Sequence, residues 1–344
     1  MFKRFQSPVS ADQGQQDSRR SFLKGAAGAS LGAAATAAAL PIGVSARNAI
    51  VPEGASDAGP APSQDSADIP PPAILRKRIP RSGELLPVIG LGTSQTFNVS
   101  AEAEVTALVP VMRAFLDSGG ALIDSSPMYG KSETVTGQLL ARVDRRDIFF
   151  ATKVWTEEGK EAGIAQMNES MRRMGAGERL DLMQVHNLVD WETHLPTLRE
   201  WKEAGKLRYL GITEMRDWET VERIMREEDI DFIQVPYSMG ERAVEERILP
   251  AANDLGVAVL VMRPFMRSRL FQQVEGKALP AWAAEIDCSS WAQFFLKWII
   301  GHPAVTCPIP ATSDAGHMID DMRAGSGRMP DEDMRKRMLE TVMG

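Results

Sequence analysis

From about Ile74 to its end, the chain repeats one unit eight times: a short apolar, often β-branched run followed by a segment of helical periodicity. This alternation is typical of a parallel sheet covered by helices, because parallel neighbours need a long crossover connection. Eight units predict an α/β fold, a closed (β/α)8 TIM barrel. The predicted strands are Pro87–Thr93, Ala121–Asp124, Ile148–Val154, Leu180–His186, Leu207–Thr213, Phe232–Tyr237, Ala258–Arg263 and Val305–Ile309.

An open, doubly wound sheet is the competing fold. It needs a glycine-rich phosphate turn after an early strand, and Gly90-Leu91-Gly92-Thr93 lacks the third glycine and the acidic partner. The barrel is therefore preferred. Ala73–Ile79 and Glu84–Leu86 flank Pro80-Arg81-Ser82-Gly83, which predicts an N-terminal β-hairpin that plugs the barrel floor.

The first 46 residues have the pattern of a twin-arginine (Tat) signal peptide. Arg19-Arg20 precede an Ala/Gly-rich run from Gly25 to Leu40, and Val44-Ser45-Ala46 resembles a cleavage site. The run is too short and too weakly apolar to predict a membrane span. Residues 47–73 contain few large apolar side chains and are predicted to be a disordered linker, which leaves 74–344 for the barrel. We expect the twin-arginine translocase as a partner and a periplasmic or otherwise exported location.

Charge and rare residues exclude several kinds of partner and site. The formal net charge is −7, and because residues 1–46 carry a net +3, the remainder carries −10, which does not suggest nucleic-acid binding. Cys288 and Cys307 cannot form a disulfide framework and are expected to be small buried side chains, although a single bridge stays open. The four histidines form no His-x-His or Glu-x-x-His pair, so no metal site is expected.

Polar side chains stand at the carboxyl ends of three consecutive predicted strands. Asp124 ends the second strand and Tyr129 follows in its loop, Lys153 stands near the end of the third, and His186 ends the fourth. The mouth of a (β/α)8 barrel is formed by these strand ends. We therefore expect the four side chains to converge on one point.

The four residue types together fit the reduction of a carbonyl group. A carbonyl that accepts a hydride develops negative charge on oxygen and needs a proton, which Tyr129 can supply. Lys153 is expected to lower the pKa of the phenol, and Asp124 to fix the lysine charge in a dry site. His186 can donate a hydrogen bond that orients the carbonyl.

The aspartate, the tyrosine five residues on, Thr152-Lys153 and Gln184-Val185-His186-Asn187 resemble the tetrad motifs of the aldo/keto reductase family, over about Ile79 to Ala324. The resemblance implies reduction of an aldehyde or ketone, a small-molecule carbonyl substrate, with Tyr129 as general acid. It implies NADPH as cofactor, with NADH as the alternative, and no metal.

The resemblance also implies cofactor positions. Thr213-Glu214 stands where the family often has Ser-Asn, Met262 where an aromatic ring often stacks on nicotinamide, and Arg263–Arg267 in the pyrophosphate turn. Basic residues that often hold the 2′-phosphate are replaced by Ala311 and His317. The expected cofactor contacts are Gly92, Thr93, Asp124, Thr213, Gln234, Met262, Arg263, Pro264, Phe265, Arg267, Ala311, Thr312, Ser313, His317 and Asp321.

Large side chains in the predicted loops suggest an apolar or aromatic substrate pocket, with Phe97, Met128, Trp155 and Trp191 as its predicted walls, beside Phe265. Two other functions stay open. One is a barrel that binds the nicotinamide cofactor as a regulatory or redox-sensing module with little turnover. The other is a barrel hydrolase or isomerase that uses Asp124 and a further carboxylate.

Overall fold

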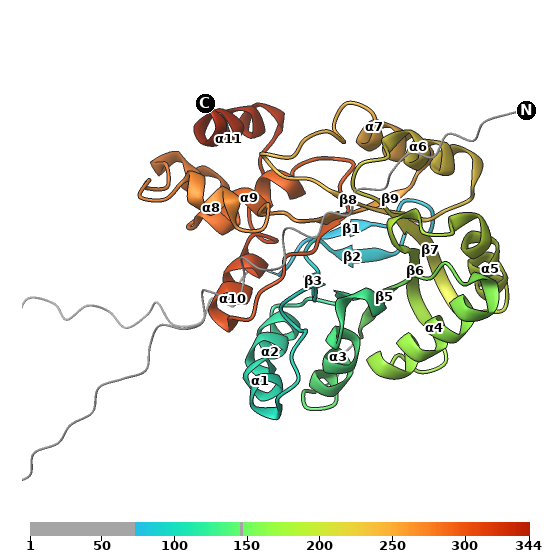
Figure 1. The fold of residues 1–344 in the computed structure, drawn as a ribbon. Coiled ribbons are helices and arrows are strands. Elements are labelled where there is room, and N and C mark those ends of the chain that lie inside the picture. Colours follow the sequence, from blue (N-terminus) through green and yellow to red (C-terminus); the bar gives the residue numbers. More distant parts are fainter. Residues whose placement is uncertain (1–72, 145–146) are drawn as a thin grey trace, which may run out of the picture. The chain divides into compact units, whose positions relative to one another are not determined.

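The computed structural model describes residues 73–144 and 147–344. The predicted signal peptide and all but the last residue of the predicted linker lie outside the described residues. The described part is one sheet of eight parallel strands with helices packed around it, and a separate two-stranded hairpin (Figure 1). Strand order follows the sequence from β3 to β10, as expected for a (β/α)8 barrel.

All eight predicted strand units are confirmed, with shorter ends in places. The strands are β3 Leu91–Gly92, β4 Leu122–Asp124, β5 Phe149–Val154, β6 Leu180–Val185, β7 Leu207–Thr213, β8 Phe232–Pro236, β9 Ala258–Met262 and β10 Cys307–Pro308. β10 is shorter than predicted because Pro308 and Pro310 have no N–H to donate to a ladder.

Backbone contacts join the first and last strand segments. Gly90 N donates to Pro308 O at 3.0 Å, and Gly92 N donates to Pro310 O at 2.8 Å. A Cβ on Gly92 would lie 2.7 Å from Ile309 O, so the close approach requires glycine there. The barrel is closed at a point that also borders the functional cavity described below.

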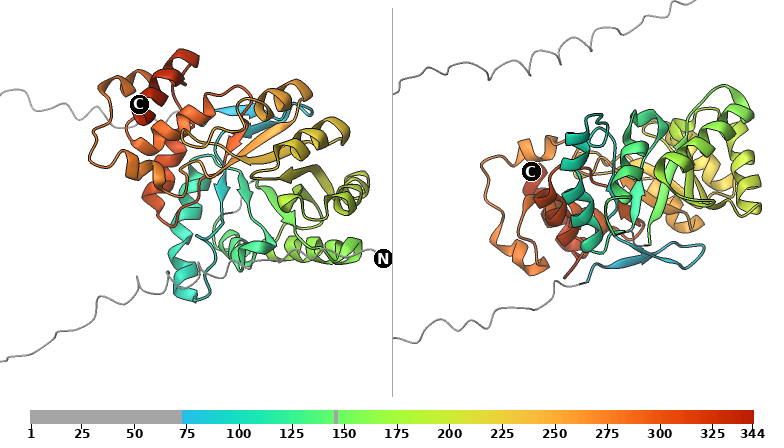
Figure 2. Two further views of the ribbon diagram at one scale, coloured as in Figure 1. Left: turned by 45° about the horizontal axis from the view of Figure 1, so that its top comes forward. Right: turned by 90° about the horizontal axis from the view of Figure 1, so that it is seen from below.

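The predicted hairpin is present as β1 Arg76–Arg78 and β2 Leu85–Pro87, which pair antiparallel. Ile79 and Leu86 are fully buried in one cluster with Leu122, Phe149 and other side chains from the beginnings of the barrel strands. The hairpin crosses this end of the barrel, as the two views of Figure 2 show. The amino-terminal end is therefore closed, and the carboxyl ends of the strands are left for chemistry.

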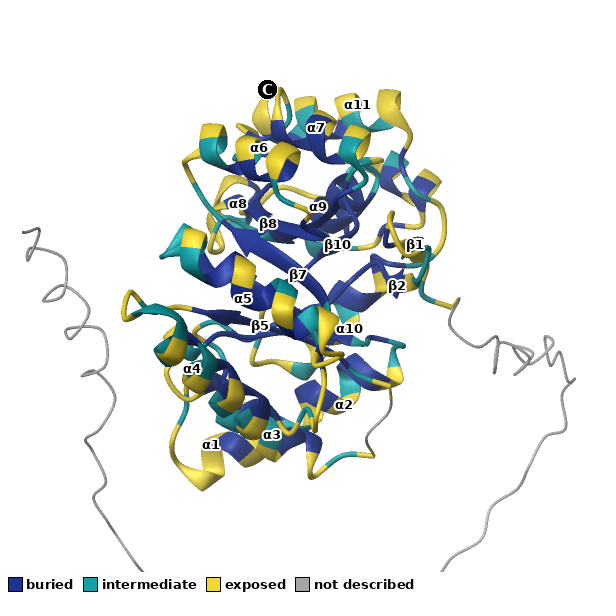
Figure 3. Ribbon diagram, turned by 90° about the vertical axis from the view of Figure 1, so that its right-hand side faces the viewer, coloured by how far each residue is buried: buried dark blue, intermediate teal, exposed yellow. Residues whose placement is uncertain are grey.

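Helices follow every strand of the barrel and bury one face against it (Figure 3). Their amphipathic spacing explains this, since apolar residues three and four apart share a face. The α-helices are α1 Glu102–Ala107, α2 Val109–Asp117, α3 Ser132–Leu140, α4 Gly159–Met174, α5 Trp191–Glu203, α6 Trp218–Glu227, α7 Ile248–Leu255, α8 Arg269–Gln273, α9 Trp291–Ile300, α10 Ala315–Arg323 and α11 Glu332–Met343. Short 3-10 turns are η2 Pro127–Tyr129, η3 His186–Leu188 and η4 Ala281–Ile286.

The barrel strands are almost entirely buried, and they separate a small interior cluster from the larger core between sheet and helices. Cys288 and Cys307 are both free and buried. Within residues 73–144 and 147–344, no helix is long and apolar enough to cross a membrane.

Candidate active site

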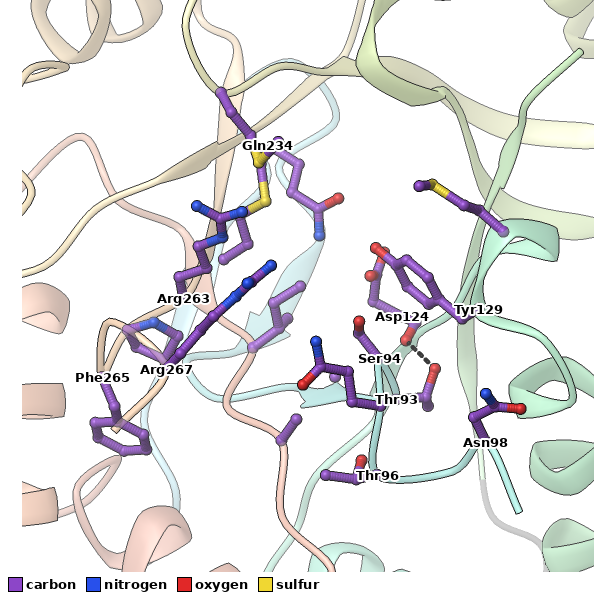
Figure 4. Close-up of a pocket in the computed structure, with 18 of the residues that line it drawn as sticks. Thr93, Ser94, Thr96, Asn98, Asp124, Tyr129, Gln234, Arg263, Phe265 and Arg267 are labelled. Atoms are coloured by element: carbon purple, nitrogen blue, oxygen red, sulfur yellow. Dashed lines mark hydrogen bonds between the residues drawn. The ribbon is translucent and has the colours of Figure 1, made fainter. Parts of the chain in front are cut away.

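A cavity of about 610 Å³ opens at the carboxyl ends of the barrel strands. Its wall includes Asp124, Tyr129, His186 and the segment Met262–Phe265. Asp124 and Tyr129 lie across the cavity from Arg263 and Phe265 (Figure 4). Lys153 lies directly behind this wall, fully buried. The structure thus brings together the four side chains that the sequence places at strand ends.

Lys153 and Asp124 form a buried ion pair beneath the cavity. Lys153 Nζ lies 2.6 Å from Asp124 Oδ2 and donates a second hydrogen bond to Ser125 O at 2.7 Å, while Gln184 Nε2 donates to Asp124 Oδ1 at 3.2 Å. The two side chains are 0% and 2% exposed. Burial alone would lower the pKa of Lys153, but Asp124 and Tyr129 raise it by more, so the lysine stays charged.

Tyr129 sits on η2, directly after the end of β4, with Lys153 Nζ 5.1 Å from the centre of its ring. Withdrawal from water raises the pKa of the phenol, and the nearby Lys153 charge opposes this without reversing it. Lys153 thus has the expected lowering effect on the pKa of the phenol, but burial outweighs it, and the pKa of Tyr129 is raised overall. Lys153 limits the rise, and Tyr129 remains protonated at neutral pH.

His186 meets Tyr129 edge to face, with ring centres 5.6 Å apart and an interplanar angle of 87°. Burial, followed by the charge of Lys153, lowers the pKa of His186 to about 3. The imidazole is consequently neutral at physiological pH. The next residues, Asn187, Leu188 and Asp190, all have positive φ although none is glycine, which turns the chain sharply out of β6.

Two arginines face the tetrad across the cavity. Arg263 and Arg267 line it (Figure 4), and neither guanidinium makes a salt bridge or hydrogen bond to another described residue. Burial lowers the pKa of Arg263, and the charge of Arg267 lowers it further. Positive φ at Arg263, Met266, Arg267 and Ser268 holds this turn in an unusual conformation. The result is a positive wall able to bind an anion.

Other expected nicotinamide contacts divide into two groups. Gly92, Thr93, Gln234 and Met262 line the cavity, as do Pro264, Phe265 and Ala311. Thr213 does not line it; Thr213 is buried, and its hydroxyl accepts a hydrogen bond from Asn187 N at 3.0 Å. Glu214 stands where the family often has Asn, and its carboxylate cannot donate a hydrogen bond as an Asn side chain can. The carboxylate instead accepts hydrogen bonds from the N–H groups of the next three residues.

Of the expected adenosine segment, Ala311 lines the cavity, whereas Thr312, Ser313, His317 and Asp321 lie outside its wall. Thr312 accepts a hydrogen bond from Asp314 N, and Asp314 caps α10 by accepting one from His317 N at 2.8 Å. Ser313 and His317 are exposed. Asp321 is buried, and burial together with Asp320 raises its pKa well above the usual range.

The predicted apolar substrate walls need correction. Met128, which is 47% exposed, and Phe265 line the cavity, but Phe97, Trp155 and Trp191 do not. Phe97 is fully buried in the main core, and Trp191 packs under Arg223, whose guanidinium lies 5.5 Å from the Trp191 ring. Trp155 lies outside the cavity, and its backbone N–H and C=O form reciprocal hydrogen bonds with the Gln166 side chain on α4.

A polar loop takes the place of those aromatic walls. Ser94, Gln95, Thr96 and Asn98, which follow β3, all line the cavity (Figure 4). Thr96 Oγ1 is buried without a hydrogen-bond partner among the described residues. This side of the cavity therefore favours a polar ligand over an aromatic one.

Sequence reasoning assigned no role to two residues that contact the tetrad. Gln184 stands two residues before His186, and the period of two along a strand would have placed both on one face. Ser126 Oγ lies 2.9 Å from His186 Nδ1, a contact between distant segments for which the sequence carries no signal. In the described part of the chain, no three His, Cys, Asp or Glu side chains are grouped to hold a metal ion.

Known proteins resemble the chain in sequence. The family model described as "Aldo/keto reductase family" matches residues 88–337. Methylglyoxal reductase YeaE of Escherichia coli (strain K12) is 27% identical over 255 residues, which cover 71% of this chain and 88% of that protein. Aldo-keto reductase YhdN of Bacillus subtilis (strain 168) is 29% identical over 177 residues, 47% of this chain; the match spans only 53% of the length of that relative.

Solved structures share the fold. An aldo/keto reductase from Klebsiella pneumoniae, solved with NADP and acetate, has a TM-score of 0.65 at 22% identity, with 78% of this chain and 96% of that chain covered. The glycerol dehydrogenase AKR11B4 of Gluconobacter oxydans has a TM-score of 0.63 at 22% identity, with 78% and 94% covered. Because the family model matches well over half of the sequence and the fold agrees, the chain belongs to the aldo/keto reductase family.

Proposed function

We propose that this protein reduces an aldehyde or ketone to an alcohol with a nicotinamide cofactor, NADPH in preference to NADH. The observation that carries the proposal is the convergence of two neutral donors, Tyr129 and His186, above a buried Lys153–Asp124 pair in one cavity. Both Asp124 oxygens are already engaged, by Lys153 and Gln184, which disfavours a hydrolase that would use this carboxylate as a nucleophile.

The residues divide the chemistry between them. A nicotinamide cofactor, when bound, would supply a hydride to the carbonyl carbon. Tyr129 supplies the proton from its phenol oxygen to the carbonyl oxygen, and Lys153 stabilises the phenolate that is left. His186 donates a hydrogen bond to the same oxygen and stabilises the charge that develops there.

The residues present fit a nicotinamide dinucleotide. Gln234 Oε1 is buried without a partner in the described part of the chain, at a place where a carboxamide N–H₂ can donate to it. Arg263 and Arg267 are free to bind phosphate oxygens. The NADP-bound relative from Klebsiella pneumoniae supports the same choice of cofactor.

Binding and turnover are tested on the purified protein. We expect NADPH fluorescence to change on binding, and the bound NADPH to be oxidised in a single turnover when a small aldehyde is added. Binding without oxidation would favour a regulatory barrel. Absence of binding to both NADPH and NADH would refute the proposal.

The amino-terminal segment supports a second part of the proposal, export by the twin-arginine translocase to the periplasm. Its support is the Arg19-Arg20 pair, the Ala/Gly-rich run and the small residues before position 47. Cell fractionation tests it with the charge-preserving pair Arg19→Lys and Arg20→Lys. Periplasmic protein cut after Ala46, lost in the double variant, is expected; a cytoplasmic pool unaffected by the change would contradict export.

A further inference from the structure

Ser126 links the turn that carries Tyr129 to the imidazole of His186. It is fully buried directly after β4 and caps η2, where its Oγ accepts a hydrogen bond from Met128 N at 3.2 Å. The same oxygen lies 2.9 Å from His186 Nδ1, contributed by a segment 60 residues later. These are its two hydrogen-bond partners in the described part of the chain.

The positions of the protons follow from counting donors and acceptors. A serine hydroxyl has one proton and can accept two hydrogen bonds. If Nδ1 carried the imidazole proton, Ser126 Oγ would accept from both Nδ1 and Met128, and its own buried proton would have no described acceptor. If the hydroxyl donates to Nδ1, the Ser126 hydroxyl, Nδ1 and Met128 N all have partners, and buried polar groups nearly always have one. The second arrangement is therefore favoured.

The count of donors and acceptors applies only if the His186 imidazole is neutral. A protonated imidazole would carry N–H groups on both nitrogens, and Ser126 would then accept from Nδ1. Burial and the Lys153 charge keep the ring neutral, with a pKa lowered to about 3, so only one nitrogen carries a proton at physiological pH. A hydroxyl donated to Nδ1 places that proton on Nε2.

We propose that Ser126 is a positioning residue that donates its hydroxyl proton to Nδ1 of His186 and so holds the imidazole as the Nε2–H tautomer. The role of this tautomer rests on the proposed function, in which the Nε2–H group donates a hydrogen bond to the carbonyl oxygen of the substrate. The other tautomer would present a lone pair to that oxygen, which repels the developing charge. Ser126 thereby prepares the donor before substrate arrives.

The tautomer is measured directly in the resting protein by ¹⁵N NMR of histidine-labelled samples. His186 is one of four histidines, and its signals are assigned by their loss in His186→Gln. We expect wild-type His186 to show a protonated Nε2 and an unprotonated Nδ1. A wild-type spectrum with the proton on Nδ1 overturns the proposal, whatever happens to any variant.

Three variants separate positioning from packing. Ser126→Ala should give a mixture of tautomers, and Ser126→Thr, which keeps a hydroxyl and the cap, should restore the single one. Ser132→Ala is the matched control, because it removes an equally buried serine hydroxyl whose bonds go to the carbonyls of Thr93 and Tyr129. Its spectrum should match wild type. An unchanged tautomer in Ser126→Ala also overturns the proposal.

Kinetics provide the second readout. In Ser126→Ala, kcat/KM for an aldehyde should fall about tenfold or more while the Kd of the cofactor stays within about twofold, as expected for loss of an oriented donor. Equal losses in Ser126→Ala and Ser126→Thr would show packing alone and refute positioning. If the wild type reduces no carbonyl compound, the proposed function fails while the NMR result on Ser126 still stands.

Discussion

The buried ion pair beneath the cavity predicts a large, specific loss of stability on removal of Lys153. Lys153→Met leaves Asp124, 2% exposed, with one hydrogen bond from Gln184 and no counter-charge. Breaking a buried pair from one side costs about 3–5 kcal/mol, because the remaining charge is neither solvated nor compensated. For a domain of this size that corresponds to a Tm lower by roughly 6–15 °C.

Denaturant unfolding measures this loss, and a double-mutant cycle identifies its cause. Asp124→Asn keeps an acceptor for Gln184 and removes the charge, so the double variant Lys153→Met with Asp124→Asn contains no unpaired charge. Its free energy of unfolding should exceed the additive value by about 2–3 kcal/mol. Activity should stay low in Lys153→Met, in Asp124→Asn and in the double variant. Only the free energy of unfolding should recover in the double variant.

Lys160 provides the matched control. Its ion pair with Glu200 is nearly as short, at 2.7 Å, but the two side chains are 42% and 57% exposed. Lys160→Met should therefore cost less than about 1 kcal/mol. Similar costs for Lys153→Met and Lys160→Met, or additive behaviour in the cycle, would refute the reasoning that burial decides the energy of the pair.

Four further outcomes are expected. Tyr129→Phe should keep cofactor affinity, measured by fluorescence titration, and lose about 10²-fold or more in kcat; near-normal turnover would remove Tyr129 as the acid. Reduction should depend little on pH between about 5 and 9, since the pKa of His186 is about 3 and that of Tyr129 is raised above its usual value near 10, so the proton donor is lost only in strong alkali; a pH–rate profile with a midpoint near neutrality would contradict this. Titrations should give an NADPH preference over NADH below about 10²-fold, and a much larger one would mean that Arg263 or Arg267 reaches the 2′-phosphate. Hydroxylated aldehydes should have a higher kcat/KM than alkyl aldehydes of equal length, and Thr96→Val should narrow the difference; an aromatic preference would show that the polar loop does not contact substrate.

Much of the barrel could be predicted because its signals are local. Each strand unit is a short apolar run, and parallel topology forces all carboxyl ends to one side, so Asp124, Lys153 and His186 had to lie near one another. The hairpin was predicted for a similar reason, from two short runs around a Pro-containing turn. Strand periodicity and barrel topology are therefore enough to predict where a residue lies when its place along a strand determines its place in the barrel.

The cavity walls could not be predicted in this way, because loop side chains are placed by contacts between distant segments. The backbone of Trp155 is held by the Gln166 side chain on α4, and the Trp191 ring packs against Arg223 on α6. The turn after β6 depends on a positive φ at Asn187. Asn also adopts negative φ, so the residue type does not predict this conformation. Aromatic character alone therefore predicted three walls, Phe97, Trp155 and Trp191, that do not line the cavity. No sequence pattern predicted that the small polar residues of the β3 loop would line it.

Burial also explains how one cavity keeps two proton donors ready. The same exclusion of water that raises the pKa of Tyr129 lowers that of His186, because in each case it disfavours the charged form. An acid and a base thus become two neutral donors at the same pH. Lys153, a buried cation close to both, opposes the change in pKa at Tyr129 and reinforces it at His186. Its partner Asp124 keeps that cation in place, so the pair beneath the cavity adjusts both donors without itself touching the carbonyl oxygen.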